Sequence, residues 1–175
     1  MIQRSNEQRK DDEKKILVAL QKFQKENIDK IAKDTGFSRQ KVHKAIKEME
    51  QNQTIWGYGA VVDEERQDLE KFMLLIKRAT KKIDKKTADQ LISYRTSENI
   101  KGLGINVINS YFAHGEYDWV LIFTAPDIRK AKKFSTVLLN DYPGMATKIT
   151  LLQLLMTLRS QHILNPNYMK LREFL

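Results

Sequence analysis

The sequence predicts an α+β protein, in which a helical unit is followed by a module of order βαββαβ. Up to residue 52, apolar residues recur at the three-to-four-residue spacing of amphipathic helices. After residue 54, aromatic and β-branched runs alternate with two further helical patterns. The 175 residues are enough for two small domains. We expect a helical domain over 1–52, a linker strand or hinge over 53–66, a ferredoxin-like domain over 67–160 and a tail over 161–175.

The first two helices of the N-terminal unit are predicted from their apolar stripes. The first helix is expected between Asp11 and Gln24, with a stripe of Ile16, Leu17, Leu20 and Phe23. The second helix has its apolar face at Ile28, Ile31, Ala32 and Thr35. Ala32 is small enough to let neighbouring helices cross closely.

A sharp turn is predicted between the second and third helices. Gly36 stands at the turn, where a residue that takes positive φ without steric cost is needed. Ser38 is suited to cap the third helix, and Asn52, which tolerates a left-handed conformation, is expected to end it. The buried stripe of this third helix is Val42, Ala45, Ile46 and Met49. The pattern is that of a plain or winged helix-turn-helix, whose second helix enters the major groove of DNA.

The opposite face of the third helix is polar and basic. Residues suited to read base edges are Ser38, Arg39, Gln40, His43 and Lys44. Residues suited to contact phosphates are Lys33, Lys41 and Lys47. The alternative is that these are solvated helices of a small bundle, since lysine-rich faces are common. The formal net charge of +9 is weak support for DNA, because residues 1–59 hold thirteen Lys/Arg and nine Asp/Glu, which leaves only +4 there.

The segment Ile55–Val62 reads as a strand-like linker, because aromatic and β-branched residues are interleaved with glycines. Its glycines give freedom to hinge. The large side chains are suited to bury against a second copy of the chain, and the expected dimer contacts are Ile55, Trp56 and Tyr58. Stacking of Trp56 on a nucleic-acid base is the alternative, and we favour packing.

The C-terminal module contains four predicted strands and two helices. The strands are expected over 72–77, 105–113, 118–123 and 148–158, and the helices over 84–94 and from a cap at Asp127. A turn over 114–117 joins the second and third strands. Two helices would cover one face of such a sheet, and its other face would be free for a dimer contact or a ligand.

Four stretches in this order resemble the Lrp/AsnC family of transcriptional regulators, the feast/famine proteins. They are DTGFSRQKVHKAIKEME, IWGYGAVVD, GEYDWVLIF and YPGMATKIT, and the resemblance extends from about Asp11 to His162. It implies a sequence-specific regulator that binds double-stranded DNA as a homodimer, often assembled further into tetramers or octamers. It also implies a C-terminal domain, called RAM, that senses a small effector such as an amino acid.

The same resemblance places the effector motif at Gly115, Tyr117 and Asp118. A carboxylate such as that of Asp118 could pair with an α-ammonium group, and turn amides could hold an α-carboxylate. The alternative is that Gly115 is a turn residue and Asp118 caps a strand end, and the residues favour neither reading. The chain departs from many relatives at Ala45, where they carry Arg, and at Gln53, where they carry Gly. Residues 97–104 look longer than usual, which puts an ordinary amino-acid effector in question.

An enzymatic role finds little support in the residues. His43, His114 and His162 show no metal-ligand spacing, there is no phosphate-binding glycine loop, and cysteine is absent. We therefore expect no metal and no cofactor. The alternative is an enzyme similar to the tetrapyrrole (siroheme) decarboxylases, which look like repurposed relatives, with His114 as its marker. The polar N-terminus is neither a signal peptide nor a membrane anchor, so we expect a cytoplasmic protein without membrane contact.

Overall fold

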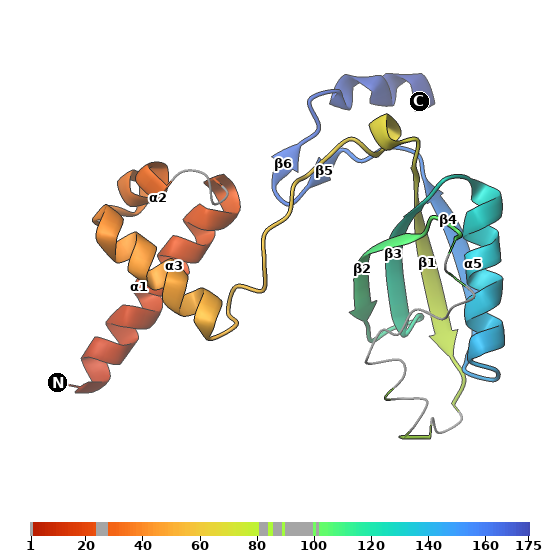
Figure 1. The fold of residues 1–175 in the computed structure, drawn as a ribbon, viewed down its shortest axis with the longest axis horizontal. Coiled ribbons are helices and arrows are strands. Elements are labelled where there is room, and N and C mark those ends of the chain that lie inside the picture. Colours follow the sequence, from red (N-terminus) through yellow and green to blue (C-terminus); the bar gives the residue numbers. More distant parts are fainter. Residues whose placement is uncertain (1, 24–27, 81–83, 86–88, 90–99, 101) are drawn as a thin grey trace. The chain divides into compact units, whose positions relative to one another are not determined.

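A computed structural model describes residues 2–23, 28–80, 84–85, 89, 100 and 102–175 (Figure 1). The chain divides into two compact units, one of Met1–Val61 with Thr157–Leu175 and one of Val62–Met156. The domain boundaries expected from the sequence stay predictions. No helix among the described residues is both long enough and apolar enough to cross a lipid bilayer.

The first unit contains the three expected helices, α1 (Ile2–Phe23), α2 (Ile28–Thr35) and α3 (Arg39–Gln51). Helix α1 begins well before Asp11, and polar pairs four residues apart, such as Arg9 with Glu13 at 3.1 Å, support its early turns. The core between the helices confirms the predicted stripes, and it consists of Ile16, Ala19, Leu20, Ile31, Val42, Ile46 and Met49. The side chain of Phe23 lies outside the described residues.

The turn between α2 and α3 confirms the roles of Gly36 and Ser38. Gly36 has φ +72°, and a Cβ there would meet no atom within 4 Å, so backbone conformation rather than space calls for glycine. The Ser38 hydroxyl accepts a hydrogen bond from the Lys41 amide at 3.2 Å. Asn52 follows the last residue of α3, as expected, but the left-handed conformation predicted for it was wrong. Asn52 has φ −89°, and Gln53 is the left-handed residue, with φ +62°.

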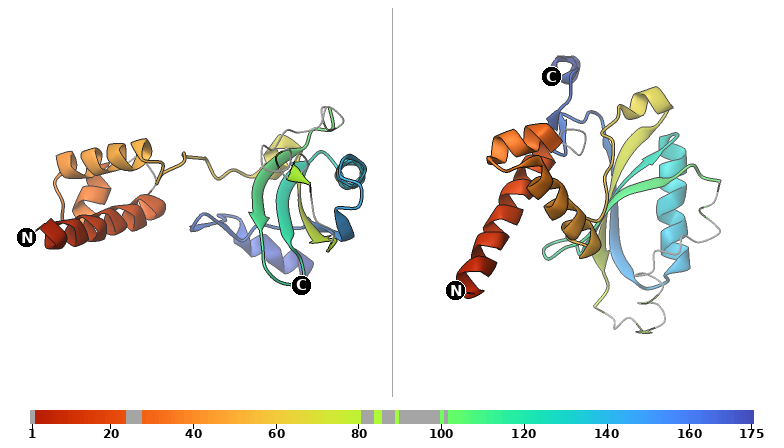
Figure 2. Two further views of the ribbon diagram at one scale, coloured as in Figure 1. Left: turned by 90° about the horizontal axis from the view of Figure 1, so that it is seen from below. Right: turned by 60° about the vertical axis from the view of Figure 1, so that its left-hand side comes forward.

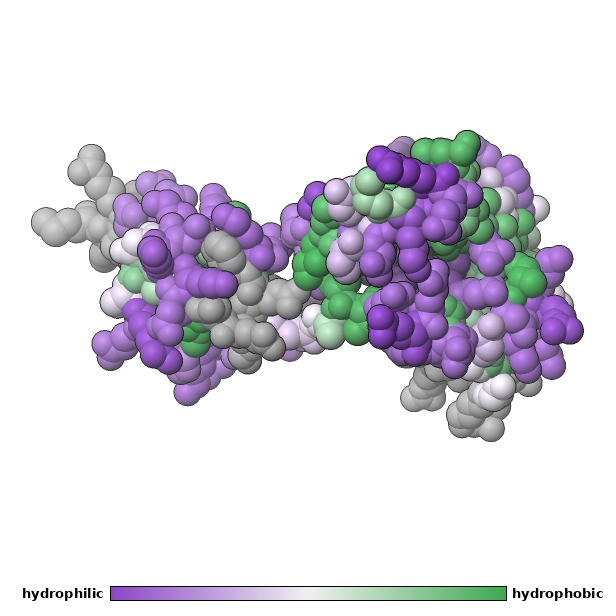
Figure 3. Space-filling model, turned by 90° about the horizontal axis from the view of Figure 1, so that it is seen from above, coloured by the Kyte–Doolittle hydropathy of each residue, from purple (hydrophilic) through white to green (hydrophobic). Residues whose placement is uncertain are grey.

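The linker was expected to form a strand, but residues 56–63 are neither helix nor strand. A strand needs a hydrogen-bonded neighbour, and no described segment of the same chain pairs with this one. The tail holds a short hairpin of β5 (Arg159–Ser160) and β6 (Ile163–Leu164), followed by η3 (Tyr168–Phe174). Large apolar side chains of this tail are exposed, among them Met169 and Phe174, and hydrophobic residues reach the surface seen in Figure 3.

The second unit is a four-stranded antiparallel sheet in the order β2-β3-β1-β4, preceded by η1 (Glu64–Gln67). The strands and the helix that covers the sheet are β1 (Glu70–Arg78), β2 (Asn106–Phe112), β3 (Trp119–Ala125), α5 (Ile128–Asp141) and β4 (Ala146–Leu154). The order matches the expected ferredoxin-like module. The helix predicted over 84–94 falls outside the described residues except at 84, 85 and 89. Strand β4 ends four residues before the predicted limit at 158.

Helix α5 packs on one face of the sheet (Figure 2). The Asp127 carboxylate caps it as expected, accepting a hydrogen bond from the Lys130 amide at 2.8 Å. Phe123 of the sheet contacts Phe72 and Phe134, with ring centroids 5.6 and 4.9 Å apart. The opposite face of the sheet has an apolar middle, formed by Met73, Leu75, Tyr111, Val120, Ile122 and Leu152, with Asn109, Thr150, Lys77 and Lys148 on the same face.

Candidate nucleic-acid interface and effector site

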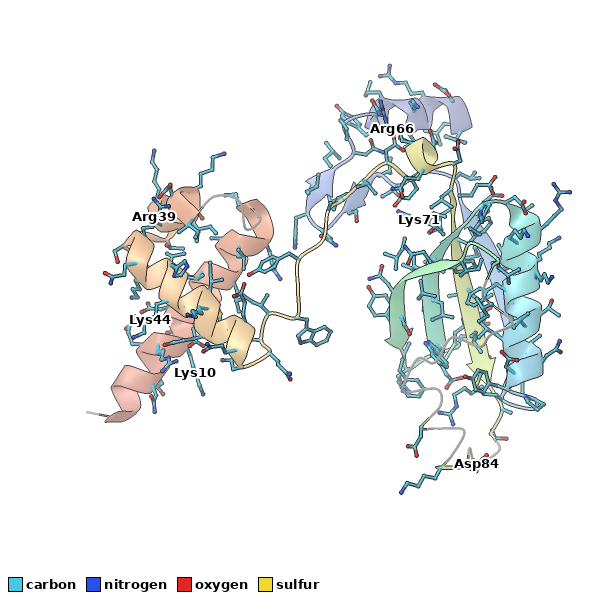
Figure 4. The ribbon with its side chains drawn as sticks, viewed as in Figure 1. Lys10, Arg39, Lys44, Arg66, Lys71 and Asp84 are labelled. Atoms are coloured by element: carbon cyan, nitrogen blue, oxygen red, sulfur yellow. The ribbon has the colours of Figure 1, made fainter. Side chains whose placement is uncertain are left out.

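Helix α3 presents one uncovered polar face. Its buried positions are Val42, Ile46 and Met49, and one turn of 3.6 residues places the remaining side chains on the opposite side. The exposed residues of that side are Arg39, Gln40, His43, Lys44 and Lys47, and Ser38 precedes them. The structure therefore brings together the residues predicted to read base edges. Figure 4 labels Arg39 and Lys44 on this helix.

The three lysines predicted to contact phosphates differ in their partners within the chain. Lys33 and Lys47 are exposed, and within the described part of the chain neither has an ion-pair partner. Lys41 is different, because its Nζ lies 2.7 Å from the Asp12 carboxylate of α1 and 3.9 Å from the centroid of the Phe37 ring. The hydrogen bond from Lys41 holds the pKa of Asp12 below its ordinary value. Lys41 therefore also joins α3 to α1.

Ion pairs at both ends of α3 were not foreseen from the sequence. Arg9 of α1 donates to the Glu48 carboxylate at 2.8 Å, and Arg39 lies 3.5 Å from Asp29 of α2. In both pairs the partners lie on different helices, so the i,i+3 and i,i+4 spacing within one helix does not predict them. They connect α3 to α1 and to α2 at the surface of the unit.

The three linker residues predicted at the dimer contact have different surroundings. Ile55 is partly buried against the helical core, and its amide donates to the Met49 carbonyl at 3.0 Å. The Tyr58 hydroxyl donates to the Glu50 carboxylate at 2.8 Å, and partial burial with this neighbouring charge raises the pKa of Tyr58 to about 12. Trp56 is 95% exposed, so the packing expected for it does not occur within the single chain.

The predicted effector residues Gly115, Tyr117 and Asp118 lie together at one end of the sheet. Asp118 accepts a hydrogen bond from the Arg78 amide at 2.8 Å through its carboxylate, which ties the end of β1 to the β2–β3 hairpin. This contact is the strand-end cap that the sequence left as an alternative. Gly115 has φ +153°, and a Cβ there would meet nothing within 4 Å.

Two lysines from neighbouring strands contact this hairpin. The sequence did not predict these contacts, because the lysines lie on other strands. Lys77 of β1 donates to the Glu116 carbonyl at 2.8 Å, and Lys148 of β4 lies 3.1 Å from the Glu116 carboxylate. The Tyr117 hydroxyl is 3.2 Å from that of Thr150. Hydrogen bonds with Thr150 and Lys148 lower the pKa of Tyr117. The end of the sheet therefore gathers carboxylates and ammonium groups, each of which has a partner within the chain.

The marker of the alternative enzymatic reading, His114, is exposed in the same hairpin. Among the described residues, no group of three or more His, Asp or Glu side chains is arranged to hold a metal ion.

No family model matches the chain, and no curated protein matches it in sequence. Solved structures do match in fold. An AsnC family transcriptional regulator from Agrobacterium tumefaciens is 19% identical, with a TM-score of 0.62, and the match covers 90% of this chain and 97% of that one.

Two similar structures hold L-methionine. A feast or famine regulatory protein from M. tuberculosis complexed with L-methionine is 16% identical over 86% of this chain and 94% of its own, with a TM-score of 0.63. A transcriptional regulator from Neisseria meningitidis complexed with L-methionine is 16% identical over 90% and 97%, with a TM-score of 0.61. The chain thus has the fold of these Lrp/AsnC regulators.

Proposed function

We propose that this protein is a sequence-specific, DNA-binding transcriptional regulator of the Lrp/AsnC type that works as a homodimer or a higher oligomer. The uncovered face of α3 carries the proposal, because Arg39, Gln40 and Lys44 are exposed together on the second helix of a helix-turn-helix. Arg suits the edge of guanine and Gln suits the edge of adenine in the major groove. The fold shared with known regulators supports the same reading.

A single helix-turn-helix makes few contacts, so specificity requires two of them about 34 Å apart, one turn of DNA. We propose that the linker and the apolar sheet face hold the two copies together. Trp56, almost fully exposed, and the face around Met73 and Ile122 offer surface for such a contact. A self-complementary dimer would give the DNA site two-fold symmetry.

The test is selection of bound duplexes from a random-sequence library with the purified full chain. We expect enrichment of a motif with two related half-sites about one DNA turn apart. The matched control is Gln40→Ala, which leaves the net charge unchanged and should alter the base preference within each half-site. Recovery of unenriched sequences by the parent protein would overturn the proposal.

We further propose that an amino acid or a similar small metabolite binds near Gly115, Tyr117 and Asp118. The convergence of Asp118 and Lys148 at one end of the sheet supports this, because a zwitterion carries an ammonium and a carboxylate. The two regulators of this fold that hold L-methionine support the ligand class. A ligand that binds one assembly state better than another would change DNA affinity.

A further inference from the structure

The outer face of α5 carries a cluster of positive charge that the proposed function leaves unused. Ala131 and Phe134 point into the core of the second unit, and one helical repeat places the opposite side chains in solvent. Those exposed residues are Arg129, Lys132, Lys133, Thr136 and Asn140, which we call the α5 outer face. The set contains three cations and no carboxylate.

The three cations lack ion-pair partners within the described part of the chain, although a hydrogen bond from the Lys130 amide and the nearby charge of Arg129 lower the pKa of the Asp127 carboxylate. Arg129, Lys132 and Lys133 form no ion pair with any described residue. The nearest carboxylate in sequence, that of Asp127, accepts hydrogen bonds as the N-cap of the helix. The charge of this face is therefore available to a partner.

Helix stability does not explain where these cations stand. Within α5 itself, the first turn contains no acidic residue and the last turn contains no basic one, so the N-cap carboxylate of Asp127 alone complements the helix dipole at the start of the helix. Cations near the N-terminal end of a helix are unfavourable for the helix itself. A contact with an anionic partner would give these exposed cations a role.

We propose that the α5 outer face is a second contact with DNA, made to phosphates and separate from the recognition helix. Lys132 and Lys133 follow Arg129 by three and four residues. Along the helix axis they lie about 4.5 Å and about 6 Å from Arg129. Phosphates of one DNA strand recur every ~3.4 Å along the duplex, so long cationic side chains at this spacing reach neighbouring phosphates. The contact would be independent of base sequence, because phosphates carry no sequence information directly.

This inference rests on the proposed function, and the test separates the two. The full chain is titrated onto a mixed-sequence duplex of about 60 base pairs, read by fluorescence anisotropy at several salt concentrations. The variant is Arg129→Gln, Lys132→Gln and Lys133→Gln combined. The matched control, Arg66→Gln with Lys170→Gln and Arg172→Gln, removes the same charge from exposed positions elsewhere. Circular dichroism confirms that each variant keeps its helices.

We expect the α5 variant to bind at least about tenfold more weakly at low salt and to reduce the slope of log K against log salt by up to about three units, with the control much less affected. Equal losses of affinity in the α5 variant and the control would show that only the net charge matters, which would overturn the inference. If Arg39→Ala weakens binding and the α5 variant does not, only the inference falls. If the parent binds no duplex, both proposals fall. In a parallel titration with anionic-lipid vesicles, a loss of vesicle binding without a loss of duplex binding would likewise overturn the DNA contact.

Discussion

Lys41 of α3 lies 2.7 Å from Asp12 of α1, and this ion pair joins the helix that we propose reads DNA to the helix that supports it. The side chain of Asp12 is only 15% exposed. Lys41 also covers the Phe37 ring at 3.9 Å. The same lysine was predicted from the sequence to contact a phosphate, so its two roles compete.

The first prediction ranks the phosphate contacts. Lys33→Gln and Lys47→Gln should each weaken binding to all DNA sequences alike and lower the salt slope by about one unit. Lys41→Gln should change the slope less, because Asp12 already compensates its charge. Titrations of one duplex at several salt concentrations measure all three. A Lys41→Gln slope change as large as that of Lys47→Gln would show that DNA displaces Asp12.

The second prediction concerns acid stability of the N-terminal unit. Lys41 holds the folded-state pKa of Asp12 below its ordinary value of 3.8, so the pair stabilises the fold above the unfolded pKa and loses this contribution as the pH falls through the folded one. Asp12→Asn should therefore be less stable than the parent at pH 6, and the difference should shrink below about pH 4. Denaturant unfolding at each pH measures it. A difference that does not depend on pH would contradict the charge explanation.

The third prediction concerns direct readout. Arg39→Ala or Gln40→Ala should cost about 1–3 kcal/mol of specific binding and relax the preference at one base pair per half-site. The exposed ion pair between Arg39 and Asp29 is long, at 3.5 Å, so little should oppose rotation of Arg39 toward a base. Competition between the selected site and a scrambled duplex measures specificity. Unchanged discrimination in both variants would place the groove contact elsewhere.

Local patterns predicted the elements well, because the residues that decide them are neighbours in sequence. Gly36, Ser38 and Asp127 act within four residues of their own positions, and each has the expected role. The end of α3 at Asn52 agrees with the prediction, and only the left-handed conformation falls one residue later. Gln53 takes the left-handed conformation, which a glycine would adopt with less strain.

The surroundings of the candidate sites could not be predicted, because they depend on strand pairing and helix packing. Asp118 meets Arg78 across forty residues, and Lys148 joins Glu116 from another strand. The same holds for Lys41 with Asp12. The linker shows a different limit, since the strand predicted from Ile55 onward needs a neighbour that the single chain does not supply in its described residues.

The fourth prediction concerns assembly through the linker. Trp56→Ala combined with Tyr58→Ala should loosen the dimer and weaken binding to the selected site while leaving the sheet domain folded. Loss of Tyr58 also removes its hydrogen bond to Glu50, so Tyr58→Phe alone is the control that removes only that bond. Light scattering at micromolar concentration measures the assembly. A parent protein that is monomeric under these conditions would contradict the model.

In a Trp119→Phe background, Trp56 is the remaining tryptophan of the chain and reports on the same contact. Its emission should shift to the blue as the protein concentration rises, because the exposed indole becomes buried in the dimer. A spectrum that does not change with concentration, in a protein shown to be a dimer, would place the interface away from the linker.

The last prediction concerns the effector residues and separates a ligand contact from a structural one. Asp118 accepts a hydrogen bond from the Arg78 amide, so Asp118→Ala removes both the charge and the cap of β1, whereas Asp118→Asn keeps an oxygen that can accept the bond. Without ligand, Asp118→Ala should unfold more easily, by about 1 kcal/mol, and Asp118→Asn should stay close to the parent. In a thermal-shift screen of amino acids and central metabolites, a compound that stabilises the parent through its ammonium group should bind Asp118→Asn more weakly by about 1.5–3 kcal/mol. If no compound stabilises the parent, or if Asp118→Asn responds equally, Asp118 serves the hairpin alone and the module is a platform for assembly.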